Sequence, residues 1–272
     1  RMAKNAYSGA QMREATCRMA SSTGCSSLGE REITSSTSDV AVSRVSLRIA
    51  SYYVHACVGT DGIFSPGRIV QLLGSLNADF IALQEVENRI VDGMLVSEQL
   101  SNRLGMHAYP GPTLQRGDAD YGNLLLARPE AAAITRHELS VLGREPRGII
   151  EADFRLDGKL MRIFVTHLGL SGAERRKQLD MLGSIIGRGG PDLSLLAADF
   201  NEWLPASPMI RQLGRHFEVS TRQRTFPSRL PLLALDRICV TPSSAFRSSR
   251  VVRSKLARQA SDHLPLVCDF AL

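Results

Sequence analysis

Residues 196–203 read Leu-Ala-Ala-Asp-Phe-Asn-Glu-Trp and close an apolar run that begins at Leu193. A short run of this kind is typical of a buried strand. Side chains two residues apart on an extended backbone point to the same side, so Asp199 and Asn201 can present their oxygens to one point in space. Such a pair suits a hard cation or a phosphate ester, but it also suits an Asp-x-Asn turn that merely closes a strand. This segment alone leaves both interpretations open.

The composition predicts an ordinary globular protein. The chain has 272 residues, of which 43% are hydrophobic and 22% are charged, which is enough for one large domain with a sizeable core. The formal net charge of +6 allows an anionic partner such as nucleic acid, phospholipid headgroups or phosphorylated metabolites. A solvated basic surface is the simpler explanation of an excess of this size.

The cysteines and the hydropathy pattern bear on the compartment. Five cysteines are scattered without Cys-x-x-Cys spacing, which argues against a disulfide framework or a zinc site and favours a reducing compartment. No apolar run approaches the roughly 18 to 20 residues that cross a bilayer, and the start shows no apolar core of a secretory signal. We therefore expect a cytoplasmic protein, and we expect it to be a monomer.

The chain divides into a tail and one domain. Residues 1–45 are rich in Ser, Thr, Ala and Met with little apolar periodicity, so we expect a disordered tail. From Leu47 onward, strand-like and helical patterns alternate without a linker or a repeat. We expect a single domain over residues 46–272.

Hydrophobic period and turn signals predict the elements of this domain. Strands are expected over 47–54, 78–83, 121–127, 147–156, 159–168, 193–198, 233–240 and 264–270. Helices are expected after Ser65-Pro66, over 92–104 and over 174–186, whereas 108–120 is expected to be a loop. Asp157-Gly158 between two alternating runs predicts a hairpin, so part of the sheet should be antiparallel.

Polar residues that can transfer protons or bind metal recur where the predicted strands end. They are Glu85, His167, Asp199 with Asn201, Asp236, and Asp262 with His263. Each one alone is more simply a solvated surface residue. Five such groups at strand ends predict a cleft with convergent polar side chains along one rim of a sheet.

The same residues stand in five short motifs: Gln84-Glu85-Val86, Thr166-His167-Leu168, residues 198–203, Leu235-Asp236-Arg237-Ile238, and Ser261-Asp262-His263-Leu264-Pro265. In order and spacing, this set resembles the motifs of the endonuclease/exonuclease/phosphatase superfamily. That superfamily includes deoxyribonuclease I, exonuclease III, inositol polyphosphate 5-phosphatases and neutral sphingomyelinases. The resemblance covers residues 46–272. It implies a four-layer α/β sandwich, with two mixed sheets packed face to face and helices outside.

The resemblance also implies a phosphoester hydrolase that depends on Mg²⁺ or Mn²⁺. It assigns Glu85, Asp262 and Asp199 to the metal, and oxygen ligands are what these cations prefer. The activity implied is that of a phosphodiesterase or endonuclease-like enzyme in which the metal assists the attack of water. The substrate remains open among DNA, RNA, a phospholipid headgroup and an inositol phosphate.

Further roles follow from the resemblance, residue by residue. Asp199 and Asn201 match the pair that orients the attacking water and contacts the phosphate or metal. Asp236 and His263 match an Asp-His dyad, in which the carboxylate fixes the imidazole tautomer and raises its basicity. His167 matches the histidine that contacts the phosphate and assists the leaving group. The Glu174–Gln178 segment is interpreted as structural.

One departure from the family pattern is Tyr53. The first strand of the family normally ends in Asn-x-His, with the asparagine beside the metal, and here the sequence is Tyr53-Val54-His55, followed by Ala56 where glycine is common. Tyrosine has no amide oxygen, and its protonated hydroxyl is a poor ligand. Losing one ligand commonly costs roughly 10- to 100-fold in affinity or activity. Two hypotheses follow: a metal-dependent phosphodiesterase with reduced activity, or an inactive relative that binds phosphorylated ligands or nucleic acid.

Overall fold

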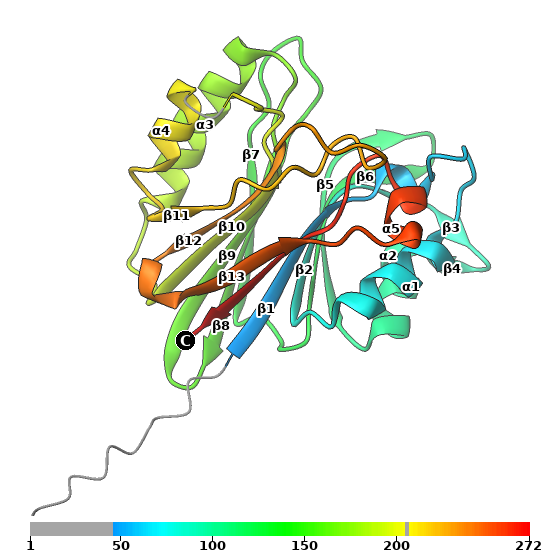
Figure 1. The fold of residues 1–272 in the computed structure, drawn as a ribbon, viewed down its shortest axis with the longest axis horizontal. Coiled ribbons are helices and arrows are strands. Elements are labelled where there is room, and N and C mark those ends of the chain that lie inside the picture. Colours follow the sequence, from blue (N-terminus) through cyan, green and yellow to red (C-terminus); the bar gives the residue numbers. More distant parts are fainter. Residues whose placement is uncertain (1–45, 205–206) are drawn as a thin grey trace, which may run out of the picture. The chain divides into compact units, whose positions relative to one another are not determined.

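The computed structural model describes residues 46–204 and 207–272, so the tail expected over residues 1–45 lies outside the described residues. Two six-stranded sheets pack face to face (Figure 1). The first has the order β13-β14-β1-β2-β6-β5, with bounds Phe246–Val251, Leu266–Ala271, Ser46–Tyr53, Phe80–Asn88, Ala119–Ala127 and His107–Arg116. The second has the order β11-β12-β10-β9-β8-β7, with bounds Val219–Ser220, Asp236–Thr241, Leu193–Asp199, Lys159–His167, Gly148–Leu156 and Ala133–Glu138.

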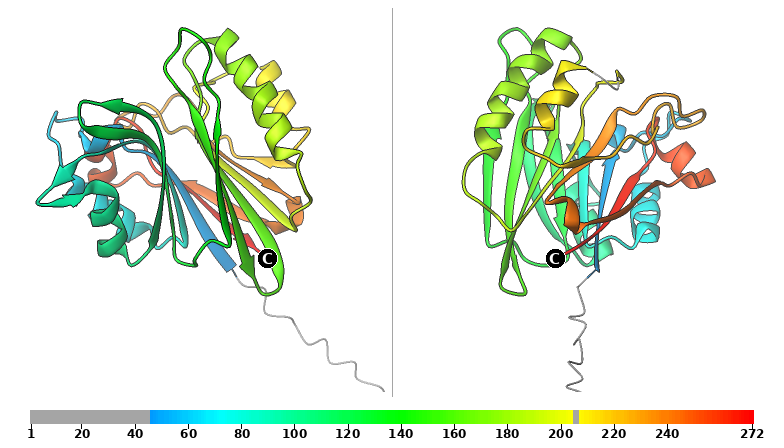
Figure 2. Two further views of the ribbon diagram at one scale, coloured as in Figure 1. Left: turned by 180° about the vertical axis from the view of Figure 1, so that it is seen from behind. Right: turned by 60° about the vertical axis from the view of Figure 1, so that its left-hand side comes forward.

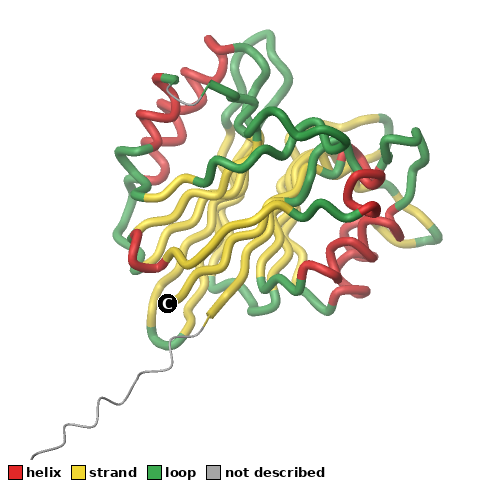
Figure 3. The backbone as a smooth tube through the Cα atoms, in the orientation of Figure 1, coloured by secondary structure: helices red, strands yellow, loops and turns green. Residues whose placement is uncertain are grey.

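Helices cover the outer face of each sheet (Figures 2 and 3). The first sheet carries α1 (Pro66–Leu76), α2 (Val96–Leu104) and α5 (Lys255–Ala260), and the second carries α3 (Gly172–Ile186) and α4 (Pro208–Leu213). Three apolar cores therefore separate four layers. The predicted four-layer α/β sandwich of two mixed sheets is confirmed. Within the described residues, no helix combines the length and apolar character needed to cross a bilayer.

Each sheet places a parallel pair of strands at its centre. β1 runs parallel to β2, and β10 runs parallel to β9, while their other neighbours are antiparallel. The register sets Tyr53 opposite Gln84 in one sheet and Asp199 opposite His167 in the other. Because parallel strands end at the same edge of a sheet, each pair delivers its final side chains to one place.

Several predicted boundaries were wrong for physical reasons. The segment 108–120, expected to be a loop, instead forms most of strand β5 and the turn into β6. β5 lies at the edge of its sheet, and an edge strand tolerates Pro110 and Pro112 because one of its sides has no neighbouring strand to receive a backbone N–H. The helix expected from residue 92 begins at Val96, because a small hairpin of β3 (Ile90–Val91) and β4 (Met94–Leu95) comes first. The edge strands β7 and β13 and the short helices α4 and α5 were not predicted. Their exposed residues interrupt any regular apolar pattern.

The core between the sheets fixes their relative position. Phe80 of the first sheet meets Phe154 of the second edge to face, with ring centroids 5.0 Å apart, and both rings are fully buried. Such aromatic pairs add to the stabilisation that comes from burial alone.

We expect Phe154→Ala to destabilise the protein by about 3 to 5 kcal/mol, since it removes a buried ring and leaves a cavity between the sheets. Urea unfolding followed by circular dichroism measures the change. Arg155→Ala, at the exposed neighbouring position, is the control and should stay within about 0.5 kcal/mol of the wild type. Equal effects of the two substitutions would contradict this account of the core.

Candidate functional site

The predicted site residues come together at one edge of the sandwich. Tyr53, His167 and Asp199 end strands β1, β9 and β10, and Asp236 begins β12 beside Asp199. Glu85 lies near the end of β2, and His263 precedes β14. Each sheet thus supplies about half of the polar side chains.

An Asp-His pair joins the two sheets. Nδ1 of His263 lies 2.8 Å from Oδ2 of Asp236, which also accepts a hydrogen bond of 2.5 Å from the Thr225 hydroxyl. Because the carboxylate only accepts, Nδ1 carries the proton. Burial would lower the pKa of His263, but the charge and hydrogen bond of Asp236, together with the charge of Asp199, raise it to about 9. The imidazole is therefore a cation at neutral pH.

The second histidine has the opposite character. Burial lowers the pKa of His167 well below its ordinary value, and the positive charges of Arg147 and His263 lower it further. The Asn201 amide nitrogen lies 2.9 Å from the Leu168 carbonyl oxygen and 3.0 Å from Nε2 of His167. Since a carbonyl only accepts, the amide NH₂ must face both partners, so Nε2 of His167 is unprotonated and Nδ1 carries the proton. A neutral His167 therefore acts as a donor through Nδ1.

Asp199 lies between these two histidines. One of its oxygens accepts the Asn201 backbone N–H at 2.8 Å, and the other lies 3.6 Å from Nε2 of His167. Burial and the negative charge of Asp236 raise the pKa of Asp199 to about 7. The carboxylate is thus poised to exchange a proton near neutral pH.

Tyr53 closes the site on the side of Glu85. Its hydroxyl donates a hydrogen bond to the Glu85 carboxylate. The Tyr53 ring stacks on His263 with centroids 4.4 Å apart and meets His167 edge-on at 5.6 Å. Burial, with the adjacent Glu85 charge, raises the pKa of Tyr53, so the hydroxyl stays protonated. Tyr53 therefore occupies one oxygen of the carboxylate expected to bind metal.

Several non-glycine residues of the site region have positive φ angles. Glu85 has φ +56° where the register shifts between Leu83 and Val86, and Asn201 has φ +51°. After β1, residues His55 to Cys57 all have positive φ, which explains why the family favours glycine at the position of Ala56. Such strain in non-glycine residues often accompanies a functional site.

The donor set suits a hard cation, although its grouping differs from the expected one. Among the described residues, the group with metal-ligand spacing is Asp199, Asp236 and His263, whose ligand atoms all lie within 4.8 Å of one another. Oδ1 of Asp236 is buried and has no hydrogen-bond partner, so this oxygen is available to a bound cation. The expected metal residues Glu85 and Asp262 are outside this group. Asp262 instead lies 3.9 Å from His55, half exposed.

Two contributors were missed in the sequence. Thr225, from the loop before β12, fixes Asp236, and buried Arg147 lines a small pocket with Glu85 and His167. Nε of Arg147 is buried without a partner, while its Nη1 donates to Glu145 at 2.8 Å. Thr225 lies in a loop and Arg147 lies directly before β8, so neither ends a core strand and no local pattern marked either residue as part of the site.

The Glu174–Gln178 segment holds the loop that follows His167. Gln178 accepts from the Gly169 N–H at 2.8 Å, and Arg175 donates to the Leu170 carbonyl at 2.6 Å. Arg175 also lies 3.4 Å from Glu202, which follows Asn201. These contacts agree with the structural role expected of the segment, because one buried guanidinium joins the loops after β9 and β10.

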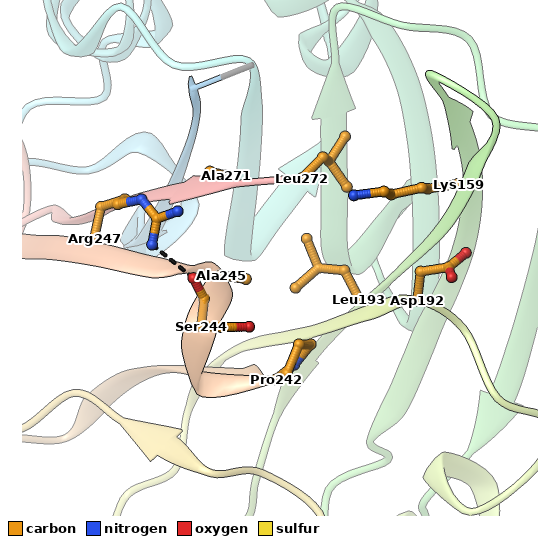
Figure 4. Close-up of a pocket in the computed structure, with 9 residues that line it drawn as sticks. All are labelled: Lys159, Asp192, Leu193, Pro242, Ser244, Ala245, Arg247, Ala271 and Leu272. Carbon is orange, nitrogen blue, oxygen red and sulfur yellow. Dashed lines mark hydrogen bonds between the residues drawn. The ribbon is translucent and has the colours of Figure 1, made fainter. Parts of the chain in front are cut away.

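A separate pocket of about 230 Å³ lies at the other end of β9 (Figure 4). It is lined by Lys159, Asp192, Leu193, Pro242, Ser244, Ala245, Arg247, Ala271 and Leu272. Since Lys159 begins the strand that His167 ends, this pocket belongs to the opposite edge of the sandwich and contains none of the predicted site residues.

In metal-free protein, we expect the His263 imidazole to titrate near pH 9 and His167 to remain neutral at neutral pH, because only His263 forms a hydrogen bond with a carboxylate, whereas burial dominates at His167. Long-range ¹H–¹⁵N NMR of the ring nitrogens measures both. Asp236→Asn should move the His263 midpoint downward, since burial then dominates, while His137 beside Glu151 serves as an unaffected control. A His263 midpoint below that of His167 would contradict the assignment.

Comparison with known proteins agrees with this architecture. Residues 60–263 match the family model described as the Endonuclease/Exonuclease/phosphatase family. The chain is 34% identical over 167 residues to the uncharacterized protein YbhP of Escherichia coli strain K12. That match covers 57% of this chain and 64% of the relative, so the chain spans less than two thirds of the relative's length.

Solved structures share the fold at low sequence identity. An endonuclease/exonuclease/phosphatase from Beutenbergia cavernae has a TM-score of 0.67 at 21% identity, covering 84% of this chain and 72% of its own. The mannosyl-6-phosphatase Bt3783 of Bacteroides thetaiotaomicron has a TM-score of 0.69 at 17% identity, covering 83% and 100%. D. rerio TDP2 complexed with a single-strand DNA product has a TM-score of 0.64 at 17% identity, covering 83% and 98%. With its family match over residues 60–263 and its four-layer sandwich, the chain belongs to the endonuclease/exonuclease/phosphatase family.

Proposed function

We propose that this protein is a divalent-metal-dependent phosphoester hydrolase of the phosphodiesterase type. The observation that carries the proposal is the cationic His263, held by Asp236 and lying within 4.8 Å of a buried Asp199. A cation and a carboxylate poised near neutral pH are the groups that the hydrolysis of a phosphoester needs, one for the phosphoryl charge and one for the water.

In the proposed mechanism, Asp199 accepts the proton of the attacking water. Its backbone hydrogen bond from Asn201 fixes the carboxylate, and burial raises its pKa above that of an ordinary aspartate, which makes it a stronger base. His263 stabilises the negative charge that grows on the phosphoryl oxygens, and Asp236 keeps the imidazole protonated and correctly oriented. Neutral His167 donates from Nδ1 to the phosphate or the leaving oxygen.

Mg²⁺ or Mn²⁺ would be held by the carboxylate of Asp199 and the unpartnered oxygen of Asp236, which the structure brings together. Glu85 and Asp262 are the further ligands that the family resemblance implies. When bound, such an ion offsets charge on the phosphoryl oxygens and lowers the pKa of water. Tyr53 holds one oxygen of Glu85, so only the other oxygen is open to the metal while this hydrogen bond lasts.

Hydrolysis of bis-p-nitrophenyl phosphate and of supercoiled plasmid DNA, each with Mg²⁺, Mn²⁺ or EDTA, tests the proposal. We expect metal-dependent release of nitrophenol, reduced about 10²- to 10⁴-fold in His263→Ala because the positioned cation is lost. Plasmid nicking would identify DNA as a substrate. A wild-type rate no greater than that of the His263→Ala protein would rule out the hydrolase.

A specific observation favours a second candidate, a binding protein without turnover. Tyr53 replaces the expected asparagine and, in addition, occupies Glu85 through its hydroxyl. The cleft keeps its cationic His263 and Arg147, so it would still attract a phosphorylated ligand.

Metal-dependent turnover by the wild type distinguishes the two candidates, and Tyr53→Asn should raise activity under either. This substitution supplies an amide oxygen and frees Glu85, so we expect metal affinity, measured by calorimetry with Mn²⁺, to rise roughly 10- to 100-fold. Turnover should rise with it. Tyr53→Phe is the matched control, because it removes only the hydroxyl and should give the smaller gain. Affinity that is unchanged in both variants would mean that Tyr53 does not obstruct the metal.

A further inference from the structure

The exposed apolar side chains are concentrated around the site. Ten large apolar residues are exposed within the described residues, and eight of them lie on connections that leave or enter the site edge: Ile63, Ile90, Leu142, Leu170, Trp203, Leu204, Leu230 and Leu232. Single exposed apolar residues are normal on any surface, but their accumulation on one face marks an interaction surface. We call the five that adjoin the site residues, Leu170, Trp203, Leu204, Leu230 and Leu232, the apolar rim.

Three members of the apolar rim are tied together beside His167 and Asn201. Arg175 donates to the Leu170 carbonyl and also lies 3.4 Å from Glu202, whose other carboxylate oxygen accepts the Leu204 N–H at 3.0 Å. Trp203 stands between Glu202 and Leu204 and is 51% exposed. Leu170, Trp203 and Leu204 are therefore presented on one buried scaffold.

The other two members lie beside His263. Phe226 and Leu233 exchange backbone hydrogen bonds of 3.1 and 2.8 Å, so the residues between them form a narrow loop that carries Leu230 and Leu232. At the base of that loop, the Phe226 ring packs on His263 with centroids 4.9 Å apart. The loop thus carries two exposed leucines, and its base packs on the imidazole of His263.

Positive charge surrounds this loop. Residues 221–235 and 251–261 contain no carboxylate but carry Arg222, Arg224, Arg229, Arg253, Lys255 and Arg258, all exposed. None of the six forms an ion pair with a carboxylate of residues 46–204 or 207–272. The two segments are one surface, because Arg258 donates to the Arg229 carbonyl at 2.9 Å and accepts from Ser228 at 3.1 Å (Figure 1). Asp61, the carboxylate that contacts the end of α5, is already paired with Arg68.

We propose that the apolar rim and these six cations dock the protein on an anionic phospholipid surface, with the site facing the headgroups. Leucines at loop tips enter the boundary between headgroups and acyl chains, tryptophan prefers that boundary, and arginine and lysine attract anionic lipid. Single-stranded nucleic acid would call for several aromatic platforms between the cations, whereas the rim offers one exposed aromatic, Trp203, among four leucines. Lipid docking makes a phospholipid phosphodiester the substrate class. That last step rests on the proposed hydrolase function, whereas the docking itself does not.

Trp203 provides the measurement, because it is the only tryptophan in the chain. Vesicles of phosphatidylcholine, with or without phosphatidylglycerol, are added in EDTA, so that binding is read without turnover. We expect the Trp203 emission to shift to the blue and to be quenched by brominated acyl chains, with anionic vesicles bound at least about tenfold more tightly than neutral ones. Added salt should weaken the anionic binding.

The double variant Leu230→Ser/Leu232→Ser should bind anionic vesicles about tenfold less tightly, while Met181→Ser, an exposed apolar residue of α3 outside the rim, should bind as the wild type does. Cleavage of bis-p-nitrophenyl phosphate should be unchanged in both, so loss of docking is distinguishable from failure of the hydrolase. Three results would overturn the docking proposal: no affinity for either vesicle, binding of a single-stranded oligonucleotide instead, or a dimer that already shields Trp203 without lipid.

Discussion

The hydrogen bond between His263 and Asp236 spans the boundary between two sheets, and the chemistry of the site depends on it. It sets the tautomer of one histidine, keeps that histidine charged, and through this charge helps to keep His167 neutral. Asp199, crowded by Asp236, holds a proton more tightly than an ordinary aspartate does. One contact of 2.8 Å thus separates the protonation behaviour of the two histidines.

The sequence predicted the parts of this molecule that rest on local pattern. Buried strands such as β10 are apolar runs in the sequence, so they could be predicted. The polar residues at their ends lie at one edge of the sheet, because parallel strands such as β9 and β10 end at the same edge. Elements at the margins escaped prediction: β5 contains prolines that only an edge strand tolerates, and β7 is largely exposed. Contacts between distant segments, such as Thr225 with Asp236, have no local signal at all.

Tyr53 marks the limit of reading a site from motifs. The sequence reveals that an amide ligand is missing, but it does not reveal what the replacement does. In the fold, the tyrosine donates to Glu85 and stacks on His263, so it contacts both the residue to which we assign metal binding and the residue to which we assign phosphate binding. The substitution therefore changes the relation between two halves of the site, which a residue-by-residue comparison with the family would miss.

Because the polar groups are divided between two sheets, their alignment is set by the apolar layer that holds the sheets together. Phe80 and Phe154 belong to no motif and do not titrate, yet their contact helps to hold together the two sheets that carry His263 and Asp236. Because that layer is closely packed, adding or removing one methylene group displaces the neighbouring side chains. The geometry of the site therefore depends on hydrophobic residues that no motif contains.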